Sequence, residues 1–376
     1  MKIVFTGGGT GGHFYPIMAV AEALDEKIRE NRILDPQFFY LAPNEYDPRS
    51  LYDQGIQFRR VYAGKRRNYF SLMNFVDLFK TAVGIFSAIF TLYDIYPDVV
   101  FSKGGYASFP TLLAARLLKI PVIIHDSDTV PGRVSLWSAK FAKKIAVSWP
   151  ESASYFPKEK VAWTGNPIRK SIMTPLKNGA HEYLKLNPEI PTILIIGGSQ
   201  GAKKINDVIV TAIPDLVSKY QIIHQTGIAN FEEINNLMTV ILKNNPNAGR
   251  YKPFDYLNEL ATRMSAGASD LIISRAGSAI FEIACWGVPS IIVPISREVS
   301  RDQTNNALAY ARTGACTIIE ETNFTPHVIV GEIDRLISRP EERAKMAQNA
   351  LNFAKRDASE KIAQAILDIA LEHEKV

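Results

Sequence analysis

Short β-prone runs alternate along the chain with longer stretches whose apolar residues recur at helical spacing. Residues 2–5 form one such run, which leads into the glycine-rich residues 6–13 and then into a helical pattern. Residues 191–196 form another, followed by the glycine-rich residues 197–202 and a second helical pattern. The same unit of strand, glycine loop and helix is therefore predicted once in each half of the chain.

Further β-prone runs occur in both halves, with helical patterns between them. They cover residues 38–42, 98–101, 122–125, 145–147, 222–224, 271–274 and 290–294. Strands that alternate with helices are typical of parallel sheets covered by helices on both faces. We therefore predict an α/β protein with two Rossmann-like doubly wound domains, whose ligand site lies in a central cleft at the carboxyl ends of both sheets.

The domain boundary is predicted from a segment that lacks regular patterning. Pairs such as Asn166-Pro167 and Asn187-Pro188 interrupt any regular element between residues 166 and 190. We expect this segment to link an N-terminal domain, residues 1–165, to a C-terminal domain, residues 191–345. Residues 346–376 are expected to form helices that pack back toward the N-terminal domain.

The composition excludes several classes of protein. A net charge of +5 over 376 residues is too dilute to indicate nucleic-acid binding. Cys285 and Cys316 lack the spacing of a zinc site or a disulfide framework, which fits a reducing cytoplasm. We expect no signal peptide and no transmembrane span, because the longest uncharged stretch, residues 81–93, falls short of the ~20 residues that a spanning helix needs.

The first glycine loop is a candidate anion site. Its amide groups can approach a phosphate, and the helix behind it adds roughly half a positive charge at its N-terminus. Gly7, Gly9 and Gly12 also match the dinucleotide fingerprint, but the acid expected ~20 residues later is missing. Two alternatives to an anion site therefore stay open for this loop. The protein could be a redox enzyme, or the glycines could only permit a tight turn.

A third loop follows the predicted strand 271–274. A helix is expected to start near Ser278, and Glu282 in its first turn could accept hydrogen bonds from a ribose diol or serve only as a helix-dipole partner. The polar residues 301–307 could bind sugar hydroxyls, or could be a helix start with Asp302 as its cap.

Five motifs along the chain together resemble one family. They are Gly8-Gly9-Thr10-Gly11-Gly12-His13-x-x-Pro16, Lys103-Gly104-Gly105-Tyr106, Thr164-Gly165-Asn166-Pro167-Ile168-Arg169, Gly197-Gly198-Ser199-Gln200-Gly201 and Arg275-Ala276-Gly277. In this order and spacing they resemble the bacterial peptidoglycan lipid I N-acetylglucosaminyltransferases of glycosyltransferase family 28. The resemblance covers essentially the whole chain.

The resemblance implies a GT-B fold, with the acceptor, lipid I, in the N-terminal half and UDP-N-acetylglucosamine in the C-terminal half. Arg169 and Ser199 would contact the donor phosphates, and Glu282 would hold the ribose. The other substrate-binding residues implied by the motifs are Thr10, Gly11, Gly12, Asp128, Gln200, Leu257, Ser278, Ala279, Asp302 and Gln303. Backbone near Leu257 would meet the uracil, and Gln303 would bind the sugar.

An inverting transfer needs a base at the acceptor hydroxyl and stabilisation of the leaving diphosphate. His13 is the leading candidate for the base. The family usually has an asparagine at the position of Asp128, so this carboxylate could compete with His13. Asp126 and Asp128 also form an Asp-x-Asp pair typical of metal sites in the other large glycosyltransferase fold. Since helix dipoles already serve the diphosphate, we expect neither a metal nor a cofactor.

Two further departures from the family pattern concern the donor half. The stretch from Arg275 to Glu282 is one residue shorter than usual, and Asp302 stands where an amide or histidine is common. The second change would alter how the sugar is recognised.

Residues 65–90 begin with Lys65-Arg66-Arg67 and continue with many aromatic and aliphatic residues. Such a segment is either a core-facing helix or one that binds the surface of an anionic bilayer. We expect peripheral binding to the cytoplasmic face of the cell membrane, because the implied acceptor is a lipid. A related transferase with another lipid acceptor, and a UDP-sugar epimerase, stay open as alternatives.

Overall fold

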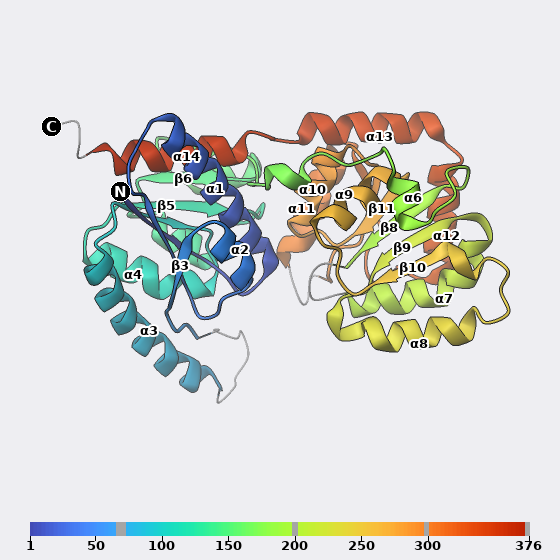
Figure 1. Cartoon of the computed structure of the whole chain (residues 1–376), viewed down its shortest axis with the longest axis horizontal. Coiled ribbons are helices and arrows are strands. Elements are labelled where there is room, and N and C mark those ends of the chain that lie inside the picture. Colours follow the sequence, from blue (N-terminus) through green and yellow to red (C-terminus); the bar gives the residue numbers. More distant parts are fainter. Residues whose placement is uncertain (65–72, 198–201, 297–300, 373–376) are drawn as a thin grey trace. The chain divides into compact units, whose positions relative to one another are not determined.

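The computed structural model describes residues 1–64, 73–197, 202–296 and 301–372. The chain divides into two compact units (Figure 1). Unit 1 comprises Met1–Arg169 and Lys355–Val376, and unit 2 comprises Lys170–Ala354. Each unit contains one parallel sheet with helices on both faces, so the predicted fold class is confirmed.

The sheet of unit 1 has the strand order β3-β2-β1-β4-β5-β6-β7. Its strands are β1 (Lys2–Thr6), β2 (Gln37–Ala42), β3 (Ile56–Arg60), β4 (Val99–Ser102), β5 (Val122–Asp126), β6 (Lys144–Val147) and β7 (Val161–Trp163). Its helices are α1 (Gly11–Glu30), α2 (Pro48–Asp53), α3 (Met73–Ile95), α4 (Phe109–Leu117), α5 (Arg133–Ser138) and α14 (Ala358–Ala370).

The alternation of side chains along β1 explains how these helices are placed. Ile3 and Phe5 lie on one face of the sheet and pack against α1 and α14. Val4 lies on the opposite face and packs in a second cluster, which includes residues of α3 and α4. Because successive side chains of a strand point to opposite faces, one buried strand contributes to two hydrophobic cores.

The sheet of unit 2 has the strand order β10-β9-β8-β11-β12-β13. Its strands are β8 (Thr192–Ile196), β9 (Gln221–Gln225), β10 (Tyr251–Phe254), β11 (Leu271–Ser274), β12 (Ser290–Ile292) and β13 (Cys316–Ile318). Its helices are α6 (Ala180–Leu184), α7 (Lys203–Lys219), α8 (Phe231–Ile241), α9 (Glu259–Ala268), α10 (Ala279–Trp286), α11 (Arg301–Arg312), α12 (Pro326–Ile337) and α13 (Pro340–Phe353).

Unit 2 repeats the two-faced arrangement. Ile193 and Ile195 of β8 pack in a cluster with α7, α8 and α12. Leu194 and Ile196 pack on the other face, in a cluster with residues of α6, α9 and α10. The two sheets therefore have the same construction, as the repeated strand and glycine-loop unit of the sequence predicts.

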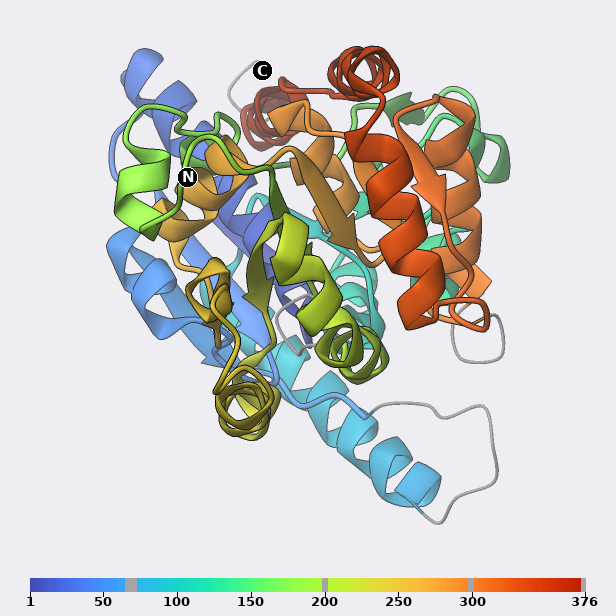
Figure 2. The ribbon, with the colours of Figure 1, turned by 90° about the vertical axis from the view of Figure 1, so that its right-hand side faces the viewer.

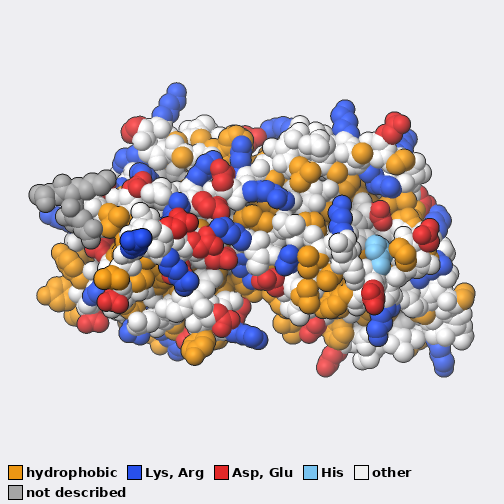
Figure 3. Space-filling view, turned by 45° about the horizontal axis from the view of Figure 1, so that its top comes forward, with side chains coloured by type: hydrophobic (Ala, Val, Ile, Leu, Met, Phe, Trp, Pro, Cys, Tyr) orange, Lys and Arg blue, Asp and Glu red, His pale blue; other side chains and the backbone are white. Residues whose placement is uncertain are grey.

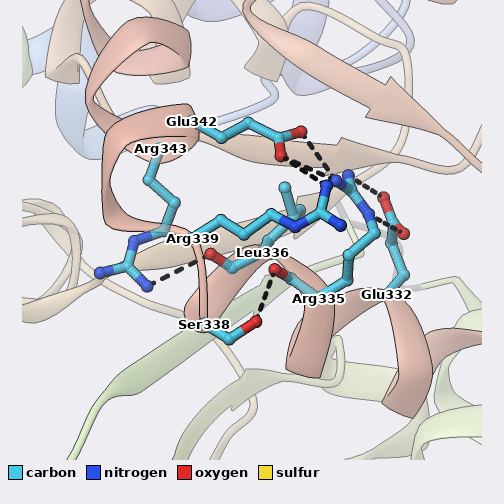
Figure 4. A network of polar contacts seen from close by, with 7 residues as sticks. All are labelled: Glu332, Arg335, Leu336, Ser338, Arg339, Glu342 and Arg343. Atoms are coloured by element: carbon cyan, nitrogen blue, oxygen red, sulfur yellow. Dashed lines mark hydrogen bonds and ion pairs between the residues drawn. The ribbon is translucent and has the colours of Figure 1, made fainter.

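The two C-terminal helices belong to different units. α13 stays in unit 2, where Arg335 of α12 forms ion pairs with Glu332 of its own helix and with Glu342 of α13 (Figure 4). α14 lies in unit 1 and packs along α1, with Ile362 and Ile366 in the core beneath it. The chain returns from unit 2 to unit 1 between Ala354 and Lys355.

The predicted amphipathic segment becomes α3, whose N-terminal part extends beyond the rest of unit 1 (Figure 2). By length and composition alone, residues Phe75–Ile95 are long and apolar enough to cross a membrane. Only 22% of the apolar part of this helix is buried within the structure. The uncharged stretch 81–93 alone is too short for a span, whereas the helix is longer because it also includes Asp77, Lys80 and Asp94. The basic residues 65–67 lie outside the described part of the chain.

Acidic and basic side chains are interspersed over both units on the face shown in Figure 3, in keeping with the small net charge. The strands expected from the sequence are all present, with ends that shift by a residue or two. The sequence analysis missed four short strands at or near the edges of the sheets, which are β3, β7, β10 and β13.

Candidate functional site

The candidate site of unit 1 lies where the strand order of its sheet reverses. β1 and β4 are neighbours in the sheet, but the chain proceeds from β1 toward β3 and from β4 toward β7. The loops that follow these two strands diverge at the carboxyl edge, which is where doubly wound sheets bind their ligands. The loop after β1 carries the glycines and His13, and the loop after β4 carries Lys103 and Gly105.

The two loops contact each other closely. The amide of Lys103 donates a hydrogen bond to the carbonyl of Thr6 at 2.9 Å. Gly7 has a φ of +147°, and a Cβ atom at this position would lie 3.1 Å from Cβ of Lys103. Gly105 has a φ of +79°, and its Cβ would lie 3.3 Å from Nε2 of His13. Side chains at these positions would strain the backbone and crowd the loops, which explains why both residues are glycines.

Thr10 and His13 are connected at the start of α1. Thr10 occupies the N-cap position, but its hydroxyl does not cap a backbone amide of the helix. Instead, Oγ1 of Thr10 lies 3.0 Å from Nδ1 of the His13 ring. The amides of His13 and Phe14 both donate to the carbonyl of Thr10 at 3.1 Å. Of the first-turn amides, those of Gly11 and Gly12 are therefore the ones left to an external acceptor.

His13 is held in its neutral form. Burial of the ring, assisted by the positive charge of Lys103, lowers the pKa of His13 to about 4. A neutral imidazole at neutral pH can accept a proton, which is the first requirement for a general base. His13 therefore stays a predicted base, with a ring that is neutral at neutral pH.

Lys103 was not identified as a site residue by the sequence analysis. Its side chain is 2% exposed, and Nζ forms no hydrogen bond to any residue that the structure describes. Burial lowers the pKa of Lys103 to about 8, although the carboxylates of Asp126 and Asp128 act in the opposite direction. A buried amine without a hydrogen-bond partner is costly, and such residues concentrate at functional sites.

The Asp-x-Asp pair follows β5 at the same edge of the sheet. Oδ1 of Asp126 accepts a hydrogen bond from the amide of Asp128 at 3.0 Å, and Oδ2 accepts one from the amide of Gly132 at 3.2 Å. These two hydrogen bonds fix the shape of the loop. The Asp126 side chain is buried, whereas that of Asp128 is half-buried. No group of three or more metal-ligating side chains occurs within the described ranges.

Arg169 is positioned by a chain of contacts in unit 1. Nε2 of the buried His125 lies 3.0 Å from the carbonyl of Gly165, four residues before Arg169. The Arg169 guanidinium stacks over the ring of Tyr15 in α1, 4.4 Å from its centroid. Arg169 thus lies beside the first turns of α1, the helix that also contains His13.

Unit 2 has its own reversal of strand order, between β8 and β11. The glycine loop after β8 includes Ser199 and Gln200, which lie outside the described residues. The loop after β11 leads into α10, whose first residue is Ala279 and whose N-cap is Ser278. The amides of Ile280 and Phe281 donate to the carbonyls of Gly277 and Ser278, which leaves those of Ser278 and Ala279 for a phosphate. Glu282 lies in the first turn, as expected.

The remaining predicted donor residues lie in α11 and in the loop between β10 and α9. Oε1 of Gln303 accepts a weak hydrogen bond from the amide of Ile295 at 3.4 Å. Asp302 lies within α11 and is not its cap, and its side chain is outside the described part. The Leu257 side chain is buried in the core of unit 2, so only its backbone is available to a ligand.

A second missed residue, Glu321, follows β13 and contacts Arg275 and the amide of Ser296. Lys103 could have been suspected from its place directly after a buried strand. Glu321 could not, because an acid after an edge strand has no distinctive sequence pattern.

Each half of the chain matches a domain model of one protein family. Residues 3–147 match the model of the glycosyltransferase family 28 N-terminal domain, and residues 192–362 match that of the family 28 C-terminal domain. The chain is 36% identical to the UDP-N-acetylglucosamine--N-acetylmuramyl-(pentapeptide) pyrophosphoryl-undecaprenol N-acetylglucosamine transferase of Treponema denticola. That match covers 97% of this chain and 96% of the relative.

Solved structures show the same fold. The crystal structure of Acinetobacter baumannii MurG aligns with a TM-score of 0.71 at 28% identity, and covers 98% of this chain and 99% of that chain. A UDP-GlcNAc 2-epimerase from Neisseria meningitidis, bound to UDP-GlcNAc, aligns with a TM-score of 0.68 over 98% of this chain and 100% of that chain. Its 18% identity shows a shared fold alone. Both domain models, and a relative similar over almost the whole length, show that this chain belongs to glycosyltransferase family 28.

Proposed function

We propose that the protein transfers N-acetylglucosamine, with inversion, from UDP-N-acetylglucosamine to the N-acetylmuramyl group of undecaprenyl-diphosphate-N-acetylmuramyl-pentapeptide. One observation carries this proposal. The similarity to a transferase named for this reaction extends over 97% of the chain and thus over both units, so it includes the acceptor half as well as the donor half.

The donor is assigned to unit 2. The diphosphate is bound by the first-turn amides of α10, at Ser278 and Ala279, together with the loop that contains Ser199 and Gln200. Glu282 holds the ribose diol, the backbone at Leu257 meets the uracil, and Gln303 with Asp302 binds the sugar. The support is that the described residues of this set follow β10, β11 and β12, whose carboxyl ends lie at one edge of the sheet.

The acceptor is assigned to unit 1, at the two loops that contain Thr10 to His13 and Lys103 to Gly105. The amides of Gly11 and Gly12 can bind an anionic group of the acceptor, and Lys103 in the adjoining loop supplies a positive charge. Arg169 neutralises charge on the diphosphate of the donor as it leaves.

His13 acts as the base that removes the proton from the acceptor hydroxyl. The hydroxyl oxygen then bonds to the anomeric carbon of the donor sugar, while the bond from that carbon to the diphosphate breaks and UDP leaves. Thr10 orients the imidazole through Nδ1. Asp128 is the competing candidate because its carboxylate follows β5 at the same edge of the sheet.

The proposed reaction needs no metal. Both carboxylate oxygens of Asp126 already accept backbone hydrogen bonds, so the Asp-x-Asp pair is explained by the shape of its loop. The charge of the leaving diphosphate is instead met by helix N-termini and Arg169.

The lipid acceptor requires access to a membrane surface, and we assign this contact to α3. Phe79, Phe86 and Phe90 on this helix are each at least 66% exposed. Aromatic side chains on an exposed apolar helix can insert below the headgroups of a bilayer. The protein therefore binds peripherally to the cytoplasmic face of the membrane, where undecaprenyl-linked acceptors are presented.

The proposal is tested by measuring UDP release from UDP-N-acetylglucosamine with and without a lipid I analogue, in the presence of EDTA. The transferase releases UDP only when the acceptor is present, and EDTA leaves the rate unchanged. A UDP-sugar epimerase would instead change the sugar of the donor without any acceptor. That outcome, or full dependence on a divalent metal, contradicts the proposal.

A further inference from the structure

Glu321 is a partly buried carboxylate at the carboxyl edge of the sheet of unit 2. It follows β13, and its side chain is only 9% exposed. A carboxylate in such a place is stable only if it is paired and hydrogen-bonded. The contacts of Glu321 therefore indicate its structural role.

Three groups approach the two oxygens of this carboxylate. Oε1 lies 2.6 Å from a guanidinium nitrogen of Arg275. Oε2 accepts a hydrogen bond from the amide of Ser296 at 3.3 Å and lies 3.8 Å from Nζ of Lys204. Burial alone would raise the pKa of Glu321, but the hydrogen bond and charge of Arg275, with smaller contributions from Ser296 and Lys204, lower it overall.

Each of these groups belongs to a different loop or helix start. Arg275 follows β11, Ser296 follows β12, and Lys204 lies in the first turn of α7, which comes after β8. The sheet has the order β8-β11-β12-β13, so a single carboxylate connects the carboxyl ends of four adjacent strands. Arg275 strengthens this connection, because it also donates a hydrogen bond to the carbonyl of Val293 at 3.1 Å.

The connected loops are those that carry the proposed donor residues. Ser278 and Ala279 come three and four residues after Arg275, and Ile295, next to Ser296, is hydrogen-bonded to Gln303. Lys204 follows the second glycine loop. A change at Glu321 would therefore affect the residues proposed to bind the diphosphate and the sugar, and also Lys204, which follows the glycine loop. Glu321 is not itself one of the proposed ligands.

We propose that Glu321 is a positioning residue for donor binding: through Arg275 and Ser296 it fixes the spacing between the α10 N-terminus and Ile295, the residue that is hydrogen-bonded to Gln303. This inference rests on the proposed donor site in unit 2. It assigns Arg275 to the same structural role, since the two guanidinium contacts given above direct that side chain into the unit, where it is 13% exposed.

A purely stabilising role is the alternative, and it predicts a different result. Loss of stability lowers the amount of folded enzyme. The observed rate then falls by the same factor at every concentration of either substrate, and the KM values do not change. Loss of donor positioning instead raises the KM for the donor and weakens UDP binding, while the KM for the acceptor is preserved. The neighbouring Glu320 is exposed and provides a matched control on the same loop.

The test compares Glu321→Gln and Glu320→Gln with the unchanged protein. Glutamine retains the size of the side chain and an acceptor for the Ser296 amide, but removes the charge that pairs with Arg275. We expect Glu321→Gln to raise both the KM for UDP-N-acetylglucosamine and the Kd for UDP about tenfold, with the acceptor KM within about twofold. Glu320→Gln should match the unchanged protein in all three quantities.

A charge exchange provides a second variant in case Glu321→Gln folds poorly. Glu321→Arg and Arg275→Glu are each expected to weaken UDP binding, and the double variant should recover part of the loss. The inference is overturned if Glu321→Gln binds UDP as tightly as Glu320→Gln, or if only thermal stability and maximal rate decline. Failure of the unchanged protein to bind UDP would instead contradict the proposed donor site.

Discussion

The ring nitrogen Nδ1 of His13 lies 3.0 Å from the hydroxyl oxygen of Thr10, in the loop that joins β1 to α1. A threonine at an N-cap usually accepts a hydrogen bond from an amide of the helix, but Thr10 does not. The contact therefore orients the imidazole and leaves the amides of Gly11 and Gly12 open. One residue serves both the proposed base and the proposed anion site.

His13→Ala should lower kcat by about 10²- to 10⁴-fold, because it removes the proposed base. Thr10→Val should cause a smaller loss, since the ring stays but is no longer oriented by a hydroxyl, and Thr10→Ser should recover most of the rate. The measurement is steady-state turnover at saturating concentrations of both substrates. If Asp128→Ala abolishes turnover while His13→Ala retains it, Asp128 is the base.

Lys103→Met should weaken acceptor binding without destabilising the fold. The substitution replaces a buried, unpartnered amine by an apolar side chain of similar length, which often preserves or raises stability. We expect a higher KM for the acceptor and a melting temperature that is unchanged or increased. Lys158→Met, at an exposed position of the same unit, is the control. An unchanged acceptor KM would remove Lys103 from the site.

The stability of unit 2 should decline in mild acid because of His224. This ring is buried between the Tyr251 hydroxyl at 2.9 Å and Oδ1 of Asn206 at 3.1 Å, and burial lowers its pKa to about 3. Below pH 6.5 His224 binds a proton in the unfolded chain, whereas in the folded unit it stays neutral until the pH approaches 3. Stability is therefore fully present above pH 6.5 and is lost by about 1.4 kcal/mol per pH unit as the pH falls toward 3.

Urea unfolding at several pH values tests this dependence. Between pH 6.5 and 4.5 the unfolding free energy of His224→Gln should fall less steeply with pH, and the difference in slope should correspond to about one proton. This difference is expected even if the stability of the variant at pH 7.5 is lower. His327→Gln, at an exposed position of unit 2, should retain the slope of the unchanged protein. Equal slopes for the two variants would contradict the assigned role of His224.

Phe86→Ser combined with Phe90→Ser should reduce binding to vesicles that contain anionic phospholipids. Both rings are exposed on α3, and their loss removes apolar area that can enter the bilayer. Tyr52→Ser, at another exposed aromatic position, on α2, serves as the control in the same flotation assay. Vesicle binding that does not distinguish the double variant from Tyr52→Ser would exclude α3 as the membrane contact.

The sequence was sufficient for the fold because the buried strands are continuous apolar runs next to glycine loops, as β1 and β8 illustrate. It was insufficient where a residue depends on contacts between loops distant in the chain. The buried state of Lys103 arises only when the loops after β1 and β4 come together, and that of Glu321 only when four strand ends meet. Asp126 resembled a metal ligand in sequence, but the structure uses both of its oxygens within one loop.

The central claim is inverting transfer of N-acetylglucosamine to a lipid-linked muramyl acceptor. The most direct measurement is the anomeric configuration of the new linkage, read by NMR from the product of UDP-N-acetylglucosamine and a lipid I analogue. Since the sugar is α-linked in the donor, we predict a β-linked disaccharide on the acceptor, formed in equal amount to the UDP released. An α linkage, or UDP release without a disaccharide product, would contradict this claim.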